Sequence, residues 1–515
     1  MAGKEKTPLF LLPCLCSETL TMNTKLISKT LIQTQNAIIS RSYYTNKTNK
    51  ATLYSKLSPL GSTPSLEPEL DSWIQSGKKV KVAELQRIIH DFRMRKRFTH
   101  ALQVSEWMNK KGICIFSPSQ HAVQLDLIGR VHGLVSAENY FNNLRDQDKN
   151  EKTYGALLNC YVQKRETDKS ISHLQKMKEM GFAKSSLSYN DIMCLYTNVG
   201  QLEKVPQVLN EMKEKNVSPD NFSYRLCMNS YGARGDLEGM EKMLNEMEHQ
   251  PDIVVDWNSY AVAASSYIKG GLTDKAIDSL KKSETRLDKK DGTGYNHLIS
   301  LYATLGEKTE VLRLWDLEKS TCGRPINKDY INIMASLVKL DEFEEVEKVL
   351  KEWESSGNFY DVRVPNTLII GYSGKGLYEK AKALLENLTE KGKATLPNIW
   401  GKVAAGFFDK NEVAKAFSCM KAALCLYEEN KEWKPNQKVI SGILSWLGDE
   451  GSAEDTEAFV SSLKNVIPMN REMYHAVLKA HIRAGKEVHG LLDAMKTYKI
   501  KEDEETKKIL SMMQN

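Results

Sequence analysis

The stretch from Ser186 to Asp220, SLSYNDIMCLYTNVGQLEKVPQVLNEMKEKNVSPD, encodes two short amphipathic helices that are closed by turns. Gly200 ends the first helix, and Pro219 closes the second because proline cannot continue a helix. A lone helical hairpin leaves an apolar face open, so the stretch predicts neighbouring copies that cover it. The apolar residues at helical spacing are Tyr189, Ile192, Met193 and Tyr196 in the first half, and Leu202, Val205, Leu209 and Met212 in the second.

Copies of this hairpin follow along the chain at a nearly constant period. Tyrosines at the same place are 35, 35, 36, 35 and 35 residues apart: Tyr154, Tyr189, Tyr224, Tyr260, Tyr295 and Tyr330. The register predicts twelve units, of which the second has a degenerate first helix. They begin at Val82, Ser117, Glu151, Ser186, Asn221, Trp257, Gly292, Asn327, Val362, Pro397, Gln437 and Arg471. Helical hairpins that repeat in this way stack into a solenoid.

We therefore predict an all-α fold, a right-handed α-solenoid of about twelve helix-turn-helix repeats with a period near 35. The solenoid covers residues 82–505, and residues 506–515 form a C-terminal capping helix. Residues 51–81 hold a linker, from Ala51 to Pro68, and an N-terminal cap helix from Leu70 to Ile74 that is anchored by Trp73.

The N-terminal segment has the character of a mitochondrial transit peptide, which we assign to residues 1–50. It carries no acidic residue from Thr19 to Leu66, while basic and hydroxyl residues are scattered among apolar ones. Arg41 begins a sequence typical of a processing site, and Met22 is a second candidate start. A plastid is the alternative destination. A secretory signal fits less well, because the apolar run from Leu9 to Cys16 is short and interrupted by Pro13.

The charge distribution limits electrostatic arguments for a polyanionic partner. The net charge of the whole chain is +6, and residues 1–66 hold eight basic and two acidic residues, so the remainder is neutral. A nucleic acid would therefore have to be attracted by a local basic surface rather than by a global excess. No apolar run reaches the roughly 18 residues that a membrane-spanning helix needs, so we expect no membrane partner.

The sequence shows none of the common catalytic or metal-binding patterns. Nine cysteines form no Cys-x-x-Cys pair, and they are interpreted as small buried thiols of a reducing compartment. There is neither a zinc-deaminase signature nor a glycine-rich phosphate loop. We expect no enzyme, no cofactor, no metal site and no small-molecule substrate, but a binding module.

Period and motifs together resemble the pentatricopeptide repeat family, in particular plant organellar members of its P-type subgroup. The similarity covers roughly residues 82–505. It rests on the opening Ser188-Tyr189-Asn190, the Gly200 turn, Met212 and the closing Ser218-Pro219-Asp220, with parallels in other units. The tetratricopeptide repeat, which binds proteins, has a period of 34 and fits the spacing less well.

The resemblance implies that single-stranded RNA lies along the solenoid, with one base for each repeat. In the family, the fifth residue of a unit and its last residue select the base. Asn190 with Asp220 matches a uracil pair, and Ser441 with Asn470 matches an adenine pair. These units are the fourth and the eleventh, so the expected target has a uracil followed seven nucleotides later by an adenine.

The other units depart from this pattern. We include Asn296, Asn366 and Arg225 as candidate RNA contacts at the same position, but their partners, Ile326, Leu396 and Asp256, do not form ordinary pairs. The remaining irregular pairs are Gly155 with Ser185, Ala261 with Asp291, Ile331 with Asp361 and His475 with Glu505. A competing explanation is that Asn, Ser and Asp at these places cap helices or form turns.

Basic residues near the ends of first helices are candidates for phosphate contacts, and Lys269 is the one that we include among the candidate RNA-binding residues. Equally, such residues complement helix C-termini. The others are Arg95, Lys96, Lys164, Arg165, Arg234, Lys339 and Arg483.

Two functions remain open at this stage. The first is an organellar RNA-binding protein that acts in stabilisation, processing, splicing or translation of a transcript, alone or with other RNA-processing proteins. The second is a protein-interaction or structural repeat subunit of the mitochondrial ribosome, which the neutral repeat region and the many irregular pairs favour.

Overall fold

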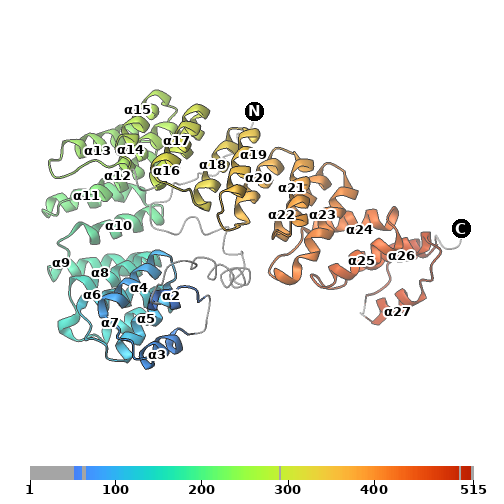
Figure 1. Ribbon diagram of the computed structural model, residues 1–515, viewed down its shortest axis with the longest axis horizontal. Helices are drawn as coiled ribbons and strands as arrows, with labels where there is room; N and C mark the ends of the chain where they lie inside the picture. The colour runs from blue at the N-terminus through green and yellow to red at the C-terminus, as the bar shows by residue number, and fades with distance from the viewer. Residues whose placement is uncertain (1–51, 61–64, 289–291, 498–499, 512–515) are drawn as a thin grey trace. The chain divides into compact units, whose positions relative to one another are not determined.

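The computed structural model describes residues 52–60, 65–288, 292–497 and 500–511. The segment assigned as a transit peptide, with Met22 and Arg41, lies outside these residues. Every regular element of the described ranges is a helix, and most helices follow one another as antiparallel pairs (Figure 1). The predicted all-α repeat fold is confirmed.

Twelve helix pairs follow the predicted register. The first helices are α4 (Val82–Met94), α6 (Pro118–Val131), α8 (Glu151–Gln163), α10 (Ser186–Asn198), α12 (Asn221–Ala233), α14 (Trp257–Lys269), α16 (Gly292–Leu305), α18 (Asn327–Lys339), α20 (Arg363–Gly374), α22 (Pro397–Asp409), α24 (Gln437–Asp449) and α26 (Arg471–Arg483). Ten of them begin at the predicted residue. The other two, α6 and α20, begin one residue later.

The second helices are α5 (Phe98–Lys110), α7 (Leu134–Asn142), α9 (Thr167–Glu179), α11 (Val205–Glu214), α13 (Leu237–His249), α15 (Thr273–Glu284), α17 (Lys308–Thr321), α19 (Phe343–Ser355), α21 (Tyr378–Glu390), α23 (Val413–Cys425), α25 (Ala453–Leu463) and α27 (His489–Thr497). Three short 3-10 turns accompany these helices: η1 (Asp146–Asp148) precedes α8, η2 (Leu202–Lys204) precedes α11, and η3 (Tyr427–Glu429) follows α23.

Three helices flank these pairs. At the N-terminal side, α2 (Leu53–Leu57) lies inside the segment that was expected to be a linker, and it buries both terminal leucines. The next helix, α3 (Glu67–Gln75), contains Trp73, which is 6% exposed and anchors it as predicted. At the C-terminal side, α28 (Glu504–Ser511) begins two residues before the predicted start at position 506.

The chain divides into two compact units, and the boundary falls within α16, between Leu301 and Tyr302. In the first unit, α10 packs against α8 and α12, and α12 packs in turn against α14. In the second unit, α20 packs against α18 and α22, and α26 packs against α24 and α28. Neighbouring first helices are therefore in direct contact in both units, so side chains at equal positions of successive first helices lie close together.

The tyrosine that sets the period is a core residue in the repeats that carry it. Tyr189 and Tyr224 are 1% exposed and Tyr330 is 2% exposed. Burying an aromatic side chain of this size stabilises the fold strongly, and it fixes the rotation of the first helix against its neighbours. This burial explains why the tyrosine spacing gave the correct helix starts.

The turn between the paired helices requires a left-handed residue. Gly200 follows α10 with a φ of +79°, as predicted, and Gly235 follows α12 with +76°. Arg165 and Lys96 hold the same conformation, with φ of +58° and +57°. A side chain in this region carries steric strain that glycine does not.

Candidate nucleic-acid interface

The junction between α10 and α12 brings Asn190 and Asp220 together. The Asn190 side-chain nitrogen donates to both carboxylate oxygens of Asp220, at 3.2 Å each. The hydroxyl of Ser223 lies 2.7 Å from the Asn190 amide oxygen, which accepts from it. Asn190 is 3% exposed and Ser223 is completely buried. The fifth and last residues of this unit thus meet in space, and a buried hydroxyl from the next helix joins them.

Asp220 is at the same time the N-cap of α12. Its Oδ1 accepts from the Ser223 backbone nitrogen at 2.8 Å, and its Oδ2 accepts from the Ser186 hydroxyl at 2.6 Å. Burial opposes ionisation, but the hydrogen bonds from Ser186, Ser223 and Asn190 outweigh it and hold the pKa of Asp220 below its usual value. The capping role considered from the sequence is therefore real, and it coexists with the pairing to Asn190.

The next junction, between α12 and α14, has the same geometry with different chemistry. Arg225 Nη1 donates to Asp256 Oδ2 at 2.6 Å, and Asp256 caps α14 by accepting from the Ser259 backbone nitrogen at 2.9 Å. The Arg225 side chain is 14% exposed and lies over the ring of Phe222. Its guanidinium is engaged with a carboxylate, so an RNA phosphate would have to compete with Asp256 for it.

Ser441 and Asn470 have other partners. The Ser441 hydroxyl donates to Glu472 Oε2 at 2.7 Å, and Asn470 caps α26 by accepting from the Met473 backbone nitrogen at 3.1 Å. The predicted adenine pair therefore consists of two residues that face the same junction but bind different groups.

Asn296 and Asn366 are each 6% exposed near the starts of α16 and α20. The Asn296 side chain donates to the Gly292 carbonyl at 2.9 Å, within its own helix. The Asn366 amide oxygen is buried, and no donor reaches it within the described parts of the chain. Both amides are thus held inside the first-helix layer.

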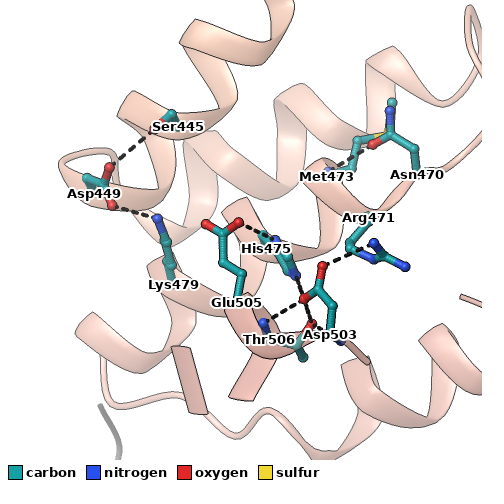
Figure 2. Close-up of polar contacts among 10 residues, drawn as sticks. All are labelled: Ser445, Asp449, Asn470, Arg471, Met473, His475, Lys479, Asp503, Glu505 and Thr506. Carbon is teal, nitrogen blue, oxygen red and sulfur yellow. Dashed lines mark hydrogen bonds and ion pairs between the residues drawn. The ribbon is translucent and has the colours of Figure 1, made fainter. Parts of the chain in front are cut away.

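The junction between α26 and α28 repeats the arrangement at the end of the described chain. Figure 2 shows His475 between the side chains of Asp503, Glu505 and Thr506. His475 Nε2 lies 2.9 Å from the Thr506 hydroxyl and 3.6 Å from Asp503 Oδ1, while Nδ1 lies 3.8 Å from Glu505. Asp503 accepts from the Thr506 backbone nitrogen at 2.9 Å. Asp503, two residues before the predicted Glu505, therefore takes the place that Asp220 has at α12.

Buried hydroxyls at the third position of first helices were not assigned a role from the sequence. Ser223, Ser259 and Thr153 are 0% exposed and form hydrogen bonds with the residue that caps their helix. Thr506 takes the same position in α28. The signal was visible as a serine or threonine directly before the periodic tyrosine, as in Thr153-Tyr154 and Ser223-Tyr224.

The candidate phosphate contacts have diverse environments. Lys269 lies at the end of α14, and desolvation of its ammonium by the surrounding protein lowers its pKa. Lys339 donates to the Thr304 hydroxyl at 2.8 Å. Arg483 donates to backbone carbonyls at the end of α24, including Gly448 at 3.0 Å, so it complements a helix C-terminus. Lys96 and Arg165 take the left-handed turn position described above.

Many other lysines pair with glutamates of the neighbouring second helix. Lys178 contacts Glu211, Lys213 Nζ lies 2.5 Å from Glu246, and Lys319 lies 3.3 Å from Glu352. Each of these pairs spans 33 residues and therefore joins successive repeats. Their positive charge is neutralised locally by the neighbouring repeat.

A polar cluster around Asp126 was also missed, and it explains the degenerate second unit. Asp126 is 5% exposed and contacts Arg93 at 3.3 Å and Arg130 at 2.9 Å, while Asn159 donates to it at 3.3 Å. These residues come from α4, α6 and α8. A buried carboxylate that is paired on both sides replaces part of the usual apolar contact, so apolar periodicity alone could not reveal α6.

The described residues show no group of three or more His, Cys, Asp or Glu side chains that could hold a metal, and none of their helices is long and apolar enough to cross a membrane. Cys160, Cys194, Cys227 and Cys419 are buried thiols, as predicted. Cys425 is exposed and Cys114 and Cys322 are half-buried, which differs from the prediction; Cys14 and Cys16 lie outside the described ranges.

Comparison with known proteins relates the chain to one family. A model described as "PPR repeat family" matches residues 184–231, and one described as "PPR repeat" matches residues 152–182, 222–250, 330–358 and 364–392. The crystal structure of the maize pentatricopeptide repeat protein PPR10 aligns with a TM-score of 0.44 and 18% identity, over 90% of this chain and 71% of that one.

Relatives from Arabidopsis thaliana align over nearly their whole length. Pentatricopeptide repeat-containing protein At4g21705, mitochondrial, is 59% identical over 92% of this chain and 97% of its own. Large ribosomal subunit protein mL101 (rPPR4) is 38% identical over 90% of this chain and 95% of its own. These relatives confirm the mitochondrial location that the N-terminal composition predicted. At this identity and coverage, the chain belongs to the pentatricopeptide repeat family.

Proposed function

We propose that the protein binds single-stranded RNA in mitochondria along its first helices, and that it acts without catalysis in the stabilisation, processing, splicing or translation of a transcript. The observation that carries this proposal is the recurring junction in which the fifth residue of one first helix meets the cap of the next. The junctions offer an amide at α10–α12, a guanidinium at α12–α14 and an imidazole at α26–α28, and side chains that differ between repeats are what reading successive bases requires.

The junction at Asn190 and Asp220 supports the proposal with a specific requirement. The side-chain amide of Asn190 forms hydrogen bonds with Asp220 and Ser223, and Asn190 is almost completely buried. A base can form a hydrogen bond with it only by replacing one of these partners. Recognition is therefore an exchange of hydrogen bonds, and the net gain depends on how well the base edge replaces Asp220 or Ser223.

Crosslinking in isolated mitochondria, followed by sequencing of the bound RNA, tests this function. We expect one or a few transcript segments to be recovered. Binding to the recovered segment is then compared with oligonucleotides in which only the expected uracil, or only the adenine seven nucleotides downstream, is changed. A lost base contact costs about 1–3 kcal/mol, so affinity falls about fivefold or more. Indifference to both changes would contradict base reading by Asn190 and Ser441.

A second candidate function is a subunit of the mitochondrial ribosome. Two observations favour it: the similarity to mL101 along 95% of that protein, and the neutralisation of many repeat lysines by glutamates of the neighbouring repeat. Gradient sedimentation of a mitochondrial extract separates the two functions. Co-migration with ribosomal particles that survives ribonuclease treatment of free RNA supports the ribosomal role, whereas slow sedimentation with a defined transcript segment supports the first proposal.

A further inference from the structure

The connection between α23 and α24 is longer than those of the other repeats. The unit that begins at Pro397 extends to Asn436, which is 40 residues against a usual 35. The extra residues form η3 and then a loop that contains Trp433, a half-buried side chain. An inserted segment that carries a tryptophan adds a large aromatic surface at one defined repeat junction.

Trp433 lies against Gly401, the fifth residue of its unit. A Cβ atom built on Gly401 would lie 3.2 Å from Cζ2 of the indole and 3.8 Å from Nε1, so the ring occupies the space next to a residue that has no side chain. Asn190 and Asn366 hold the same position in their repeats. At this junction, therefore, an indole from the connection takes the place of the hydrogen-bonding side chain found elsewhere.

The surroundings of Trp433 suit a nucleotide. Lys402, next to Gly401, and Lys434, next to Trp433, are exposed, and neither forms an ion pair with another described residue. Glu432 is the one carboxylate adjacent to the tryptophan in sequence. Other lysines nearby are occupied, since Lys431 pairs with Glu428 at 3.3 Å. An aromatic ring together with lysines that form no ion pair is the usual composition of a site that stacks a base and neutralises its phosphate, and here the lysines are next in sequence to Trp433 and to Gly401.

We propose that Trp433 is a base-stacking platform, which holds one nucleobase of single-stranded RNA at the tenth repeat without distinguishing between bases. This inference rests on the RNA-binding function proposed above. Stacking uses the face of a base, which all four bases share, whereas Gly401 offers no group to read an edge. The tenth repeat thus contributes affinity but no sequence preference, with Lys402 and Lys434 contacting the backbone.

The test uses the full chain and a 16-nucleotide RNA selected from a random pool by that protein. We compare the Trp433→Ala and Trp433→Phe variants with Tyr427→Ala, a matched control in the same connection. Loss of one stacked base weakens binding about fivefold to 100-fold, so Trp433→Ala should show such a loss, while Trp433→Phe and Tyr427→Ala remain close to the parent protein. Thermal unfolding establishes that all three variants fold.

An abasic scan of the RNA sharpens the result. In the parent protein, removal of the base at one position should weaken binding, although all four bases at that position bind equally. In Trp433→Ala this position should become insensitive to base removal. Equal affinity of Trp433→Ala and the parent overturns the platform but leaves RNA binding intact. An equal loss in Tyr427→Ala also overturns it, because the connection as a whole is then responsible. Failure of the parent protein to select any RNA overturns both proposals.

Discussion

The α10–α12 junction and the α26–α28 junction use one design with different chemistry. In each, the fifth residue of a first helix meets an aspartate that caps the helix packed against it, α12 or α28, and a buried hydroxyl from the third position of that helix joins them. The first junction has a neutral amide, Asn190, and the second has an imidazole, His475. Ser223 donates to Asn190 at 2.7 Å and to Asp220 at 3.0 Å. Thr506 likewise donates to Asp503 at 2.8 Å, and it lies 2.9 Å from His475 Nε2.

The comparison indicates that the junction is in the first place a device for stacking repeats. It forms around Asn190, which matches a base-reading pair, and also around His475, which does not. In both cases the capping aspartate and the buried hydroxyl provide hydrogen-bond partners for backbone and side-chain groups. Base selectivity is then an additional property of the fifth residue. This view explains how a repeat protein keeps its fold while most of its units lose an interpretable pair.

Removing the capping aspartate should have the largest effect at the α10–α12 junction. Asp220→Ala removes the cap of a 13-residue helix and leaves the Asn190 amide, the Ser186 hydroxyl and the Ser223 backbone N–H short of an acceptor. We expect a loss of about 2–4 kcal/mol in the local unfolding free energy of α12, the sum of a lost cap and unsatisfied buried groups. Native-state hydrogen exchange of the α12 amides measures it.

Asp503→Ala is the matched change at the other junction. Asp503 caps α28, which has 8 residues against the 13 of α12, so we expect a smaller loss that is confined to the amides of α28. Equal losses at the two junctions would contradict the ranking and indicate that the length of the capped helix does not determine the contribution of its cap residue.

Acidification should separate the two junctions. Burial lowers the pKa of His475, and Arg471 and Lys479 act in the same direction, whereas Asp503 and Glu505 oppose the shift without overcoming it. The folded state therefore favours the neutral imidazole. Its contribution is complete above the unfolded pKa of about 6.5 and is lost as the pH falls through the lower folded value. Asp220 also has a lowered pKa, so its contribution is lost only in much stronger acid.

Hydrogen exchange at pH 7.5 and pH 5.5, corrected for the intrinsic exchange rates, provides the measurement. Protection of α28 should fall at the lower pH, and protection of α12 should not. His475→Asn gives the C-terminal junction the neutral amide of the N-terminal one, and it should abolish the difference. A pH dependence that persists in this variant would show that another group is responsible.

The sequence predicted the repeats well because a buried tyrosine marks the register of six successive units, from Tyr154 to Tyr330, and the same period could be extended to the others. Ten first helices begin at the predicted residue, and α6 and α20 begin one residue later. The sequence pairs Asn190 with Asp220 as base-reading residues, and the structure places the two side chains in contact with each other. What this contact does toward RNA is a separate question that the function proposed above addresses.

The parts that could not be predicted depend on polar groups that pair only in three dimensions. From the sequence, Asp126 is expected to be a surface residue, whereas the fold places Arg93 and Arg130 beside it as ion-pair partners. The start of α28 was misplaced by two residues because the register was extended by length, whereas the helix begins where Asp503 can cap it. The short helix α2 was missed because five residues are too few for a periodic pattern.

The smallest change in unfolding free energy is expected for a substitution of Ser441. This residue is the fifth of its unit, but no buried hydroxyl from the next helix encloses it as Ser223 encloses Asn190. Its hydroxyl is partly exposed and donates to Glu472, whose carboxylate can turn to water when the partner is removed. We expect Ser441→Ala to change the unfolding free energy of α24 by about 0.5 kcal/mol or less. Asn190→Ala should cost more, because the buried Ser223 hydroxyl then loses an acceptor. Hydrogen exchange of α24 and α12 compares the two variants directly. If Ser441→Ala destabilised its junction as much as Asn190→Ala does, the enclosed hydroxyl would not be the feature that gives the fifth residue its structural role.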